Sequence, residues 1–198
     1  MAERPTEGGE GEPKKGWWRR LTTPSATWSV LALVIVGVLI GTAGVIGTQV
    51  MVAVTGTNEF CSNSCHGMTW AAEEYRKSIH YANPTGVQAG CHDCHIPHTY
   101  PQLLWVKAQA GVRDAIAEMR GVLSTEEKFK KERLRLAKDV WADIKDQNAA
   151  TCRNCHAFNT EVVAKQKEGA QPMHKMVLDG QAVCTDCHKG VAHTAPTE

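Results

Sequence analysis

The longest run of apolar positions in the chain lies near its N-terminus. From Leu21 to Asn58 there is no Asp, Glu, Lys, Arg or His, and the stretch from Trp28 to Val54 is mainly Val, Leu, Ile, Ala and Gly. About 20 such residues suffice for a helix to cross a bilayer. The apolar region of a signal peptide is shorter, roughly 7 to 15 residues, and ends at a cleavage site. We therefore predict an uncleaved transmembrane anchor at residues 21–56.

The charges that flank this segment predict its orientation. Lys14, Lys15, Arg19 and Arg20 lie shortly before it, whereas the first ionisable residue after it is Glu59. Positive residues stay on the cytoplasmic side of a membrane. We therefore expect a single pass through a bacterial inner membrane, with residues 1–20 as a short, disordered cytoplasmic segment and residues 57–198 in the periplasm. Gly37 and Gly41 form a G-x-x-x-G pattern, which allows close helix pairing in a homodimer without requiring it.

Beyond the anchor the spacing of apolar positions is helical. Residues 103–120 carry apolar side chains three and four positions apart, including Leu104, Val112 and Met119, which we expect on the inner face. Ser124-Thr-Glu-Glu127 reads as a capping box that opens a second helix, which runs to about Asn148. No run of alternating β-branched residues indicates a sheet. The predicted fold class is all-α, a single N-terminal transmembrane helix and a compact domain with little β-structure, whose two long helices are scaffold elements with solvated outer faces.

Composition raises a difficulty for this second part. It contains only three phenylalanines, Phe60, Phe129 and Phe158, and few other large apolar residues. A domain of this size needs a sizeable core to offset its conformational entropy. A net charge of +1 with no basic stripe gives no argument for nucleic acid as a partner. Something other than side chains must therefore supply buried apolar area.

All eight cysteines fall into four clusters, and each cluster ends in Cys-His. The clusters are Cys61-Ser-Asn-Ser-Cys65-His66, Cys91-His-Asp-Cys94-His95, Cys152-Arg-Asn-Cys155-His156 and Cys184-Thr-Asp-Cys187-His188. The last three match C-x-x-C-H, in which both thiols form thioethers to a haem and the histidine binds its iron. Zinc sites, disulfide frameworks and thioredoxin-like pairs also use cysteines, but none of them requires a histidine after every second cysteine.

We therefore predict four covalently bound haem c groups, which would also supply the missing core, so the apoprotein is expected not to fold. The first cluster has three residues between its cysteines. Cys65-His66 keeps the essential adjacency, so a haem is expected there as well, while a thioether from Cys61 stays open.

The remaining histidines are candidates for the opposite faces of the haem irons. Beyond the motif histidines the chain has His80, His92, His98, His174 and His193. His92 lies inside an attachment motif and is the least suited of the five. His98 and His193 follow the preceding motif histidine too closely to reach the other face of the same haem, so each is expected to bind a different one. Met68, close after His66, is either an axial ligand of the first haem or packs against it.

These motifs resemble the NapC/NirT/NrfH family of membrane-anchored tetrahaem quinol dehydrogenases, NapC above all. The resemblance covers nearly the whole chain from the anchor onward. Its segments are Glu59-Phe60-Cys61 to Cys65-His66-Gly67-Met68, Ser78-Ile79-His80-Tyr81, Gly86-Val87-Gln88-Ala89-Gly90-Cys91 to Cys94-His95-Ile96-Pro97, Ala150-Thr151-Cys152, and Cys184-Thr-Asp-Cys187-His188-Lys-Gly-Val-Ala-His193.

The resemblance implies a function and a set of residues. The family oxidises membrane quinol beside the first haem and passes electrons to a periplasmic reductase. By this resemblance His80, His98, His174 and His193 match distal ligands, Met68 matches a ligand of the first haem, and Asp93 matches an acid that accepts a quinol proton. A lysine that some members have upstream of the second motif is replaced by uncharged residues around Gln88, which favours ubiquinol over menaquinol.

Two functional interpretations remain open. The first is a quinol-oxidising enzyme that serves a terminal reductase, with periplasmic nitrate reductase favoured over nitrite or another reductase. The second is an anchored relay that another protein reduces and that has no quinol site of its own. The lack of a C-terminal extension leads us to expect a tetrahaem chain rather than one of the longer pentahaem relatives.

Overall fold

The computed structural model describes residues 28–196, apart from the side chain of His66. The predicted cytoplasmic segment, residues 1–20, lies outside the described part. The chain divides into two compact units, Met1–Thr48 and Gln49–Glu198. The second unit contains all the Cys-His motifs together with the last residues of the first long helix.

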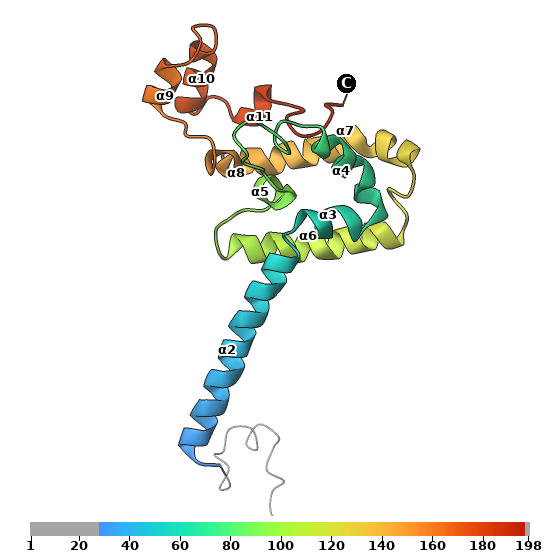
Figure 1. Ribbon diagram of the computed structural model, residues 1–198, viewed down its shortest axis with the longest axis vertical. Coiled ribbons are helices and arrows are strands. Elements are labelled where there is room, and N and C mark those ends of the chain that lie inside the picture. The colour runs from blue at the N-terminus through green and yellow to red at the C-terminus, as the bar shows by residue number, and fades with distance from the viewer. Residues whose placement is uncertain (1–27, 197–198) are drawn as a thin grey trace, which may run out of the picture. The chain divides into compact units, whose positions relative to one another are not determined.

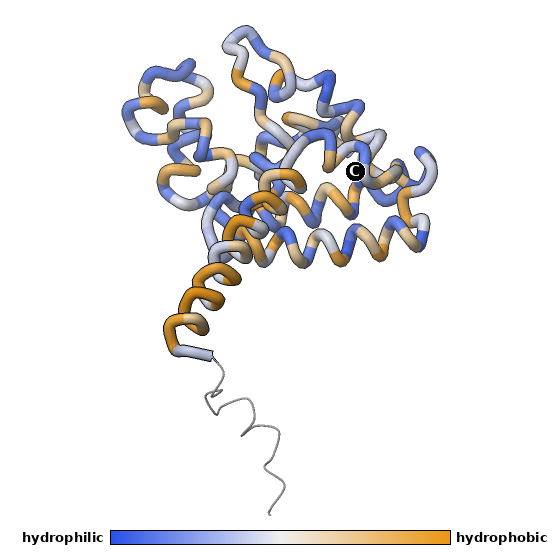
Figure 2. Tube along the Cα trace, turned by 60° about the horizontal axis from the view of Figure 1, so that its bottom comes forward, coloured by the Kyte–Doolittle hydropathy of each residue, from blue (hydrophilic) through white to orange (hydrophobic). Residues whose placement is uncertain are grey.

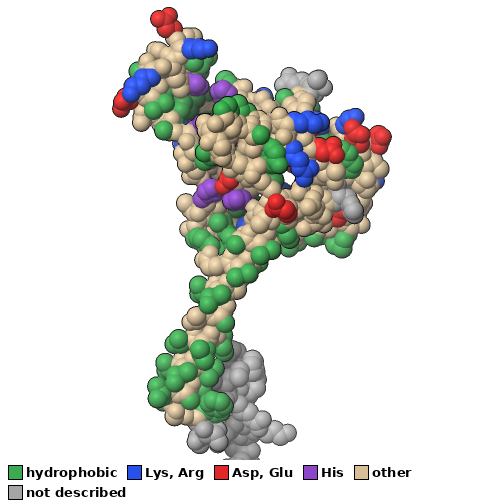
Figure 3. All heavy atoms as spheres, in the orientation of Figure 1, with side chains coloured by type: hydrophobic (Ala, Val, Ile, Leu, Met, Phe, Trp, Pro, Cys, Tyr) green, Lys and Arg blue, Asp and Glu red, His purple; other side chains and the backbone are tan. Residues whose placement is uncertain are grey.

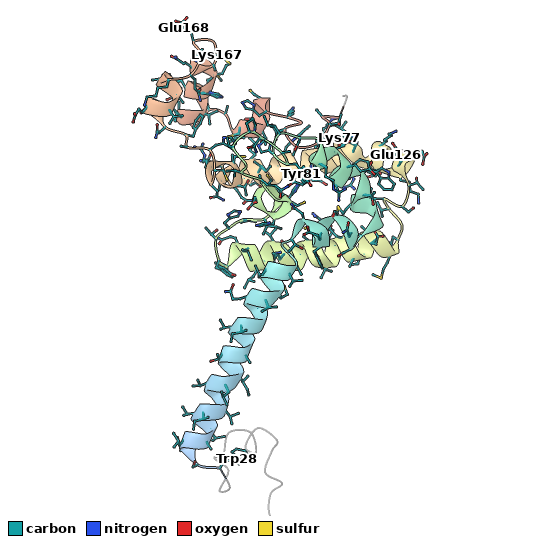
Figure 4. The ribbon with its side chains drawn as sticks, viewed as in Figure 1. Trp28, Lys77, Tyr81, Glu126, Lys167 and Glu168 are labelled. Carbon is teal, nitrogen blue, oxygen red and sulfur yellow. The ribbon has the colours of Figure 1, made fainter. Side chains whose placement is uncertain are left out.

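Every regular element in the described residues is a helix, and no strand occurs there, which confirms the all-α prediction (Figure 1). The helices are α2 (Val30–Val54), α3 (Asn58–Asn63), η1 (His66–Met68), α4 (Thr69–Arg76), α5 (Cys91–His95), α6 (Gln102–Met119), α7 (Glu126–Asp146), α8 (Ala150–Arg153), α9 (Thr160–Ala164), α10 (Gln171–Leu178) and α11 (Cys184–Cys187). Lys167 and Glu168 mark the turn between α9 and α10 (Figure 4).

Helix α2 has the length and composition of a membrane span. Its 25 residues make it about 37 Å long at 1.5 Å per residue, which exceeds the hydrocarbon core of a bilayer. It is apolar along most of its length (Figure 2), and it contains no buried residue. It is the one helix in the described part that is long and apolar enough to cross a membrane, as the sequence predicted.

The two predicted long helices are present, with bounds within two residues of the prediction. The N-cap of α7 is Thr125, whose hydroxyl accepts a hydrogen bond from the backbone N–H of Lys128. The predicted cap, Ser124, instead donates its hydroxyl to the carbonyl of Gly121. Ser124 therefore closes the preceding turn, and the helix starts one residue later than its capping signal indicates.

Each cysteine motif has its first cysteine in a short helix, and α5 and α11 contain both cysteines of their motifs. In α5 the carboxylate of Asp93 accepts a hydrogen bond from the backbone N–H of Gly90 at 2.7 Å. In α11 Asp186 does the same for Val183 at 2.9 Å. An acceptor at the third helical position satisfies a backbone donor that would otherwise have no partner at the helix start. The aspartates in the second and fourth motifs are thus part of what makes these turns helical.

Side chains alone build very little core in the described part. The buried apolar residues there are Ala72, Tyr75, Phe129, Ala149 and Val163, and no large side chain is fully enclosed. The main aromatic contact stacks Trp70 on Phe129, with ring centroids 5.8 Å apart. Tyr81, labelled in Figure 4, meets the ring of Tyr75 edge to face. Such a unit needs another source of buried apolar surface.

Helix α6 differs from its prediction in the direction of its apolar face. Of the three residues expected on the inner face, Leu104 is half-buried, but Val112 and Met119 are 64% and 80% exposed. The opposite, polar side of α6 instead makes hydrogen bonds to the rest of the unit, from Lys107 to Thr55 and from Gly67 to Glu118. These polar contacts turn the apolar positions outward, so the expectation of a solvated polar outer face is wrong for α6.

Candidate functional site

The four Cys-His segments follow one another in space as they do in the sequence. Helix α3, which carries Cys61, packs on α5, and α5 packs on α8. The thiols of Cys61 and Cys91 form a hydrogen bond, and those of Cys152 and Cys184 form another. All eight cysteines are described, and none forms a disulfide. The segments thus form a continuous series from the first to the fourth.

The first two segments meet at a pair of unequal thiols. The hydrogen bond from Cys91 outweighs partial burial and lowers the pKa of Cys61 to about 7. The same hydrogen bond, together with burial, raises the pKa of Cys91. The leading cysteines of the first and second motifs are therefore in direct contact.

Three of the motif histidines face a second histidine from a distant part of the chain. The ring centroids of His95 and His193 are 6.2 Å apart, as are those of His80 and His156. His174 faces His188 at 5.9 Å. Two imidazole nitrogens that each bind one metal at about 2 Å put their ring centroids about 6 Å apart. The three pairs therefore have the separation expected of two axial ligands on one iron.

The histidine of each pair that lies outside the Cys-His motifs is also oriented through its Nδ1 atom. Nδ1 of His80 lies 3.1 Å from the carbonyl oxygen of Val191, and Nδ1 of His193 lies 3.1 Å from that of Ala71. Nδ1 of His174 contacts the side-chain oxygen of Gln166. A histidine that donates from Nδ1 presents an unprotonated Nε2, which is the usual arrangement of a metal-binding imidazole. Burial lowers the pKa of His193, which favours the neutral form of its ring.

These observations fit haem groups. Cysteine pairs lie next to the motif histidines, the facing imidazoles have the right separation and orientation, and the side chains leave a sparse core that porphyrins would complete. Among the described residues, no three or more His, Cys, Asp or Glu side chains are arranged so that they could hold a metal ion by themselves.

The loop after the fourth motif supports two of these pairs at once. It carries His193 itself and the Val191 carbonyl that orients His80. Arg133 of α7 binds the carboxylate of Glu74 with two guanidinium nitrogens and donates to the carbonyl oxygen of Thr194 at 2.9 Å. Glu74 in turn accepts the backbone N–H of Thr194 at 3.0 Å. We call Glu74, Arg133 and Thr194 the C-terminal clamp.

The clamp is electrostatically favourable although it is partly buried. Burial opposes ionisation of Glu74, but hydrogen bonds from Arg133 and Thr194 outweigh it and hold the pKa of this carboxyl below its usual value. The guanidinium also lies over the ring of Phe129, 4.8 Å from its centroid. The loop is thus held by two hydrogen bonds of Thr194, one to each partner of an ion pair whose guanidinium rests on Phe129.

Asp93 forms a second cluster, with His92 and His98. Its Oδ1 lies 3.1 Å from Nε2 of His92 and 3.6 Å from Nε2 of His98. The rings of these two histidines stack with centroids 6.2 Å apart. In the region of α5, histidine side chains are exposed at the molecular surface next to an acidic side chain (Figure 3). His98, predicted as a distal ligand, thus lies beside Asp93 and His92. Its ring contacts none of the motif histidines whose side chains are described, His95, His156 and His188.

This cluster lies against the end of the anchor helix. A Cβ atom at Gly56, two residues after α2 ends, would be 3.8 Å from the ring of His92. Asn58, at the start of α3, accepts the backbone N–H of Cys91 at 2.9 Å. The start of the second motif is therefore joined directly to the segment that follows the anchor.

Lys107 is a residue near the first segment that the sequence analysis missed. Its ammonium group donates to the hydroxyl of Thr55 at 3.0 Å and contributes to lowering the pKa of Cys61. Partial burial lowers the pKa of Lys107 itself. The available signal was that Lys107 is the one lysine in α6.

Met68 ends the short η1 helix that His66 begins, so the two predicted ligands of the first haem share one turn.

A membrane-spanning helix joined to a helical unit with four Cys-His attachment motifs defines a membrane-anchored cytochrome of the c type. Comparison with known proteins gives the family. The model of the NapC/NirT cytochrome c family, N-terminal region, matches residues 23–198. The chain belongs to this family, whose members are membrane-anchored electron-transfer proteins with covalently bound haem c.

Individual relatives show the same relationship. The chain is 44% identical to the cytochrome c-type protein TorC of Escherichia coli K12, over 90% of this chain and 46% of TorC. It is 36% identical to NapC of Paracoccus pantotrophus, over 91% of this chain and 76% of that protein. It is 35% identical to the denitrification system component NirT of Stutzerimonas stutzeri, over 95% and 93%.

The chain thus spans about half the length of TorC and most of the length of NapC and NirT. No solved structure matches it.

Proposed function

We propose that this protein oxidises membrane quinol and relays the electrons to a periplasmic terminal reductase in anaerobic respiration. It would cross the bacterial inner membrane once, with its N-terminus in the cytoplasm and residues 57–198 in the periplasm. Family membership supports electron transfer by a membrane-anchored cytochrome. The quinol step, the partner and the orientation are our proposals.

The residues that would hold four haem c groups follow from the motifs and the imidazole pairs. The cysteines are Cys61, Cys65, Cys91, Cys94, Cys152, Cys155, Cys184 and Cys187, and the motif ligands are His66, His95, His156 and His188. His193, His80 and His174 would complete the second, third and fourth sites, with Met68 or His66 at the first. When bound, these groups supply one-electron redox chemistry. His98 as a distal ligand stays a prediction.

The observation that carries the quinol proposal is the position of Asp93 beside the end of the anchor. The Asp93 cluster touches Gly56, and a quinol in the bilayer can reach such a position without leaving the membrane surface. Quinol oxidation releases two protons, so the site needs a base within hydrogen-bond reach of the quinol hydroxyl. Asp93 would take a proton, while His92 and His98 hold its carboxylate in place.

Lys107 adds a donor on the other side of the same region. Its bond to Thr55 holds an ammonium group near Cys61, where it can orient a quinol oxygen. The lysine missing around Gln88 is therefore no obstacle to a quinol site, because α6 supplies a cation from a different part of the chain. Ubiquinol remains the favoured substrate on the sequence argument alone.

The proposed site can be tested with one pair of matched aspartates. Asp93→Asn keeps an oxygen that accepts the Gly90 N–H but loses the negative charge, so quinol-dependent haem reduction in membranes should fall by on the order of 10²- to 10⁴-fold. Asp186→Asn changes the same motif position in α11, where the carboxylate pairs with Lys145. It should leave the rate unchanged. Equal rates for Asp93→Asn, Met68→Ala and the unaltered protein would remove the quinol site.

The alternative is an anchored relay without its own quinol site. Optical spectra of the purified protein with a quinol analogue separate the two functions, because a relay stays oxidised while a quinol dehydrogenase becomes reduced. For the partner we favour periplasmic nitrate reductase, although the relatives also include TorC and the denitrification component NirT. Co-purification of a reductase with the anchored protein would identify the partner, and recovery of a nitrite or other reductase instead would exclude nitrate reductase.

A further inference from the structure

Helix α6 carries an apolar stripe that faces away from the rest of its unit. Trp105, Val112, Ile116 and Met119 are spaced by seven, four and three residues, so they share one face of the helix. Trp105 is 66% exposed and Met119 is 80% exposed. Hydrophobic side chains are visible along the edge of the molecule where α6 runs (Figure 3). We call these four residues the α6 stripe.

The opposite face of α6 has the same spacing and the opposite chemistry. Lys107, Asp114 and Glu118 are spaced by seven and four residues. Lys107 bonds Thr55, and Glu118 accepts the backbone N–H of Gly67 at 3.4 Å. The side of α6 that carries these charged groups therefore packs toward the first Cys-His segment, and the α6 stripe is left outside. A helix at the surface of a soluble domain has the reverse arrangement.

Two hydrogen bonds tie the beginning of α6 to the end of the anchor. The hydroxyl of Tyr100, just before α6, donates to the side-chain oxygen of Gln49 at 3.2 Å. Lys107, in the second turn of α6, donates to Thr55, just after α2. Because α2 is long enough to cross the bilayer, its last residues emerge at the membrane surface. The start of α6 is thereby held at the same depth.

We propose that α6 lies in the surface of the same bilayer that the anchor crosses, with the α6 stripe between the lipid headgroups and acyl chains. An interfacial helix needs an apolar face, an aromatic residue at headgroup level and nearby basic residues. Trp105 provides the aromatic ring. Arg113 and Arg120 flank the stripe and can reach lipid phosphates. The inference goes beyond quinol oxidation, since it concerns how the unit rests on the membrane.

The bilayer is favoured over a protein partner because of the link to the anchor. A second copy of the chain or a reductase could also cover an apolar face. Neither would require the stripe to begin where α6 is hydrogen-bonded to the end of a membrane helix. The helix would then form a layer between the lipid and the first Cys-His segment.

The test measures how deeply side chains of α6 enter lipid in the full, haem-loaded protein. Val112→Cys and Met119→Cys would be prepared separately, labelled with a nitroxide and reconstituted into nanodiscs of phosphatidylcholine and phosphatidylglycerol. Both positions are highly exposed, so the substitutions should not disturb folding. Collisions with oxygen, which concentrates in lipid, are compared with collisions with a water-soluble nickel chelate. We expect the oxygen-to-nickel ratio to rise several-fold at both positions relative to a surface control.

The controls are Lys131→Cys and Lys138→Cys, two exposed positions on α7. The unaltered protein, treated with the same label, gives the background from any native thiol. A ratio at positions 112 and 119 equal to that of the α7 controls would overturn the proposal. Dipolar coupling between labels on two copies would assign the stripe to a protein interface and overturn it as well. The measurement needs no quinol turnover, so its failure is distinguishable from failure of the proposed quinol site.

Discussion

The first Cys-His segment and the other three differ in what surrounds them. In the second, third and fourth segments the motif histidine faces another imidazole at about 6 Å. Around the first segment lie Lys107 and Glu118 of α6 and Leu123, which packs so closely on Gly67 that a Cβ atom there would be 2.8 Å from it. Three sites are thus paired between distant parts of the chain, while the first is set between α6 and the end of the anchor.

Under the proposed function, this difference would separate two tasks within one unit. A site with two fixed imidazoles has no room for a substrate and changes little on redox cycling, which suits a relay. A site that borders charged groups and the membrane end of the chain can exchange protons with a bound molecule. Three substitutions at or near the paired sites test this difference, and their expected effects decrease from the first to the third.

The largest effect should come from removing a distal histidine. In His193→Ala the second site keeps a single imidazole, His95, so one haem should change from a low-spin to a high-spin spectrum. Electron delivery to the reductase should fall by more than the roughly 10- to 100-fold that loss of a supporting hydrogen bond costs. Electron paramagnetic resonance and optical spectra check this. An unchanged low-spin spectrum would show that His95 and His193 are not ligands of one iron.

A smaller effect is expected from opening the C-terminal clamp. Arg133→Gln removes the bidentate partner of Glu74 and the donor to Thr194, which should cost about 1 to 3 kcal/mol of unfolding free energy. The reduction potentials of two haems should shift, because the loop carries His193 and orients His80. Arg133→Lys should restore the charge but only part of the geometry.

Thermal unfolding and redox titration measure both consequences of this change. The matched control is Arg135→Gln, since Arg135 pairs with Glu132 and Asp139 on an exposed face of the same helix. It should cost less than about 1 kcal/mol and leave every haem potential in place. If Arg133→Gln altered only one haem, the loop would not be shared between two sites.

The smallest effect should come from Gln166→Ala, which removes the acceptor for Nδ1 of His174. A hydrogen bond of this kind makes the imidazole a stronger donor to the metal and stabilises the oxidised form. The potential of the fourth haem should rise by on the order of 20 to 60 mV, the equivalent of about 0.5 to 1.5 kcal/mol. The control is Gln171→Ala, which removes a donor to the backbone carbonyls of Ala164 and Gln166 but leaves the Gln166 side chain in place. It should leave that potential unchanged.

Much of the fold was predictable because its signals are local. The anchor, the two long helices and the Cys-His motifs are each visible within 30 residues of sequence, and all are present. The selection of His80, His174 and His193 as distal candidates is supported by the facing rings, although their ligand roles remain predictions. Which ring faces which motif depends on contacts between distant segments, such as His95 with His193. Residue spacing does not encode that.

Helix α6 shows why a local signal can mislead. Its apolar positions repeat as in a core-facing helix, and the sequence contains nothing to say that the polar side packs inward. The orientation follows from hydrogen bonds of Lys107 and Glu118 to residues far away in the chain. His98 is a similar case, since its approach to Asp93 comes from the turn between α5 and α6 rather than from any motif.

The motif histidines are paired with histidines from other parts of the chain, and this pairing sets the order in which the sites are completed during synthesis. A polypeptide is made from its N-terminus, so His80 is already present when the third motif emerges, whereas His95 must wait for His193 until almost the whole unit has been made. The second site is thus the last to acquire both imidazoles. A stalled or clipped chain that lacked His193 would therefore leave the proposed second haem site with His95 as its one imidazole.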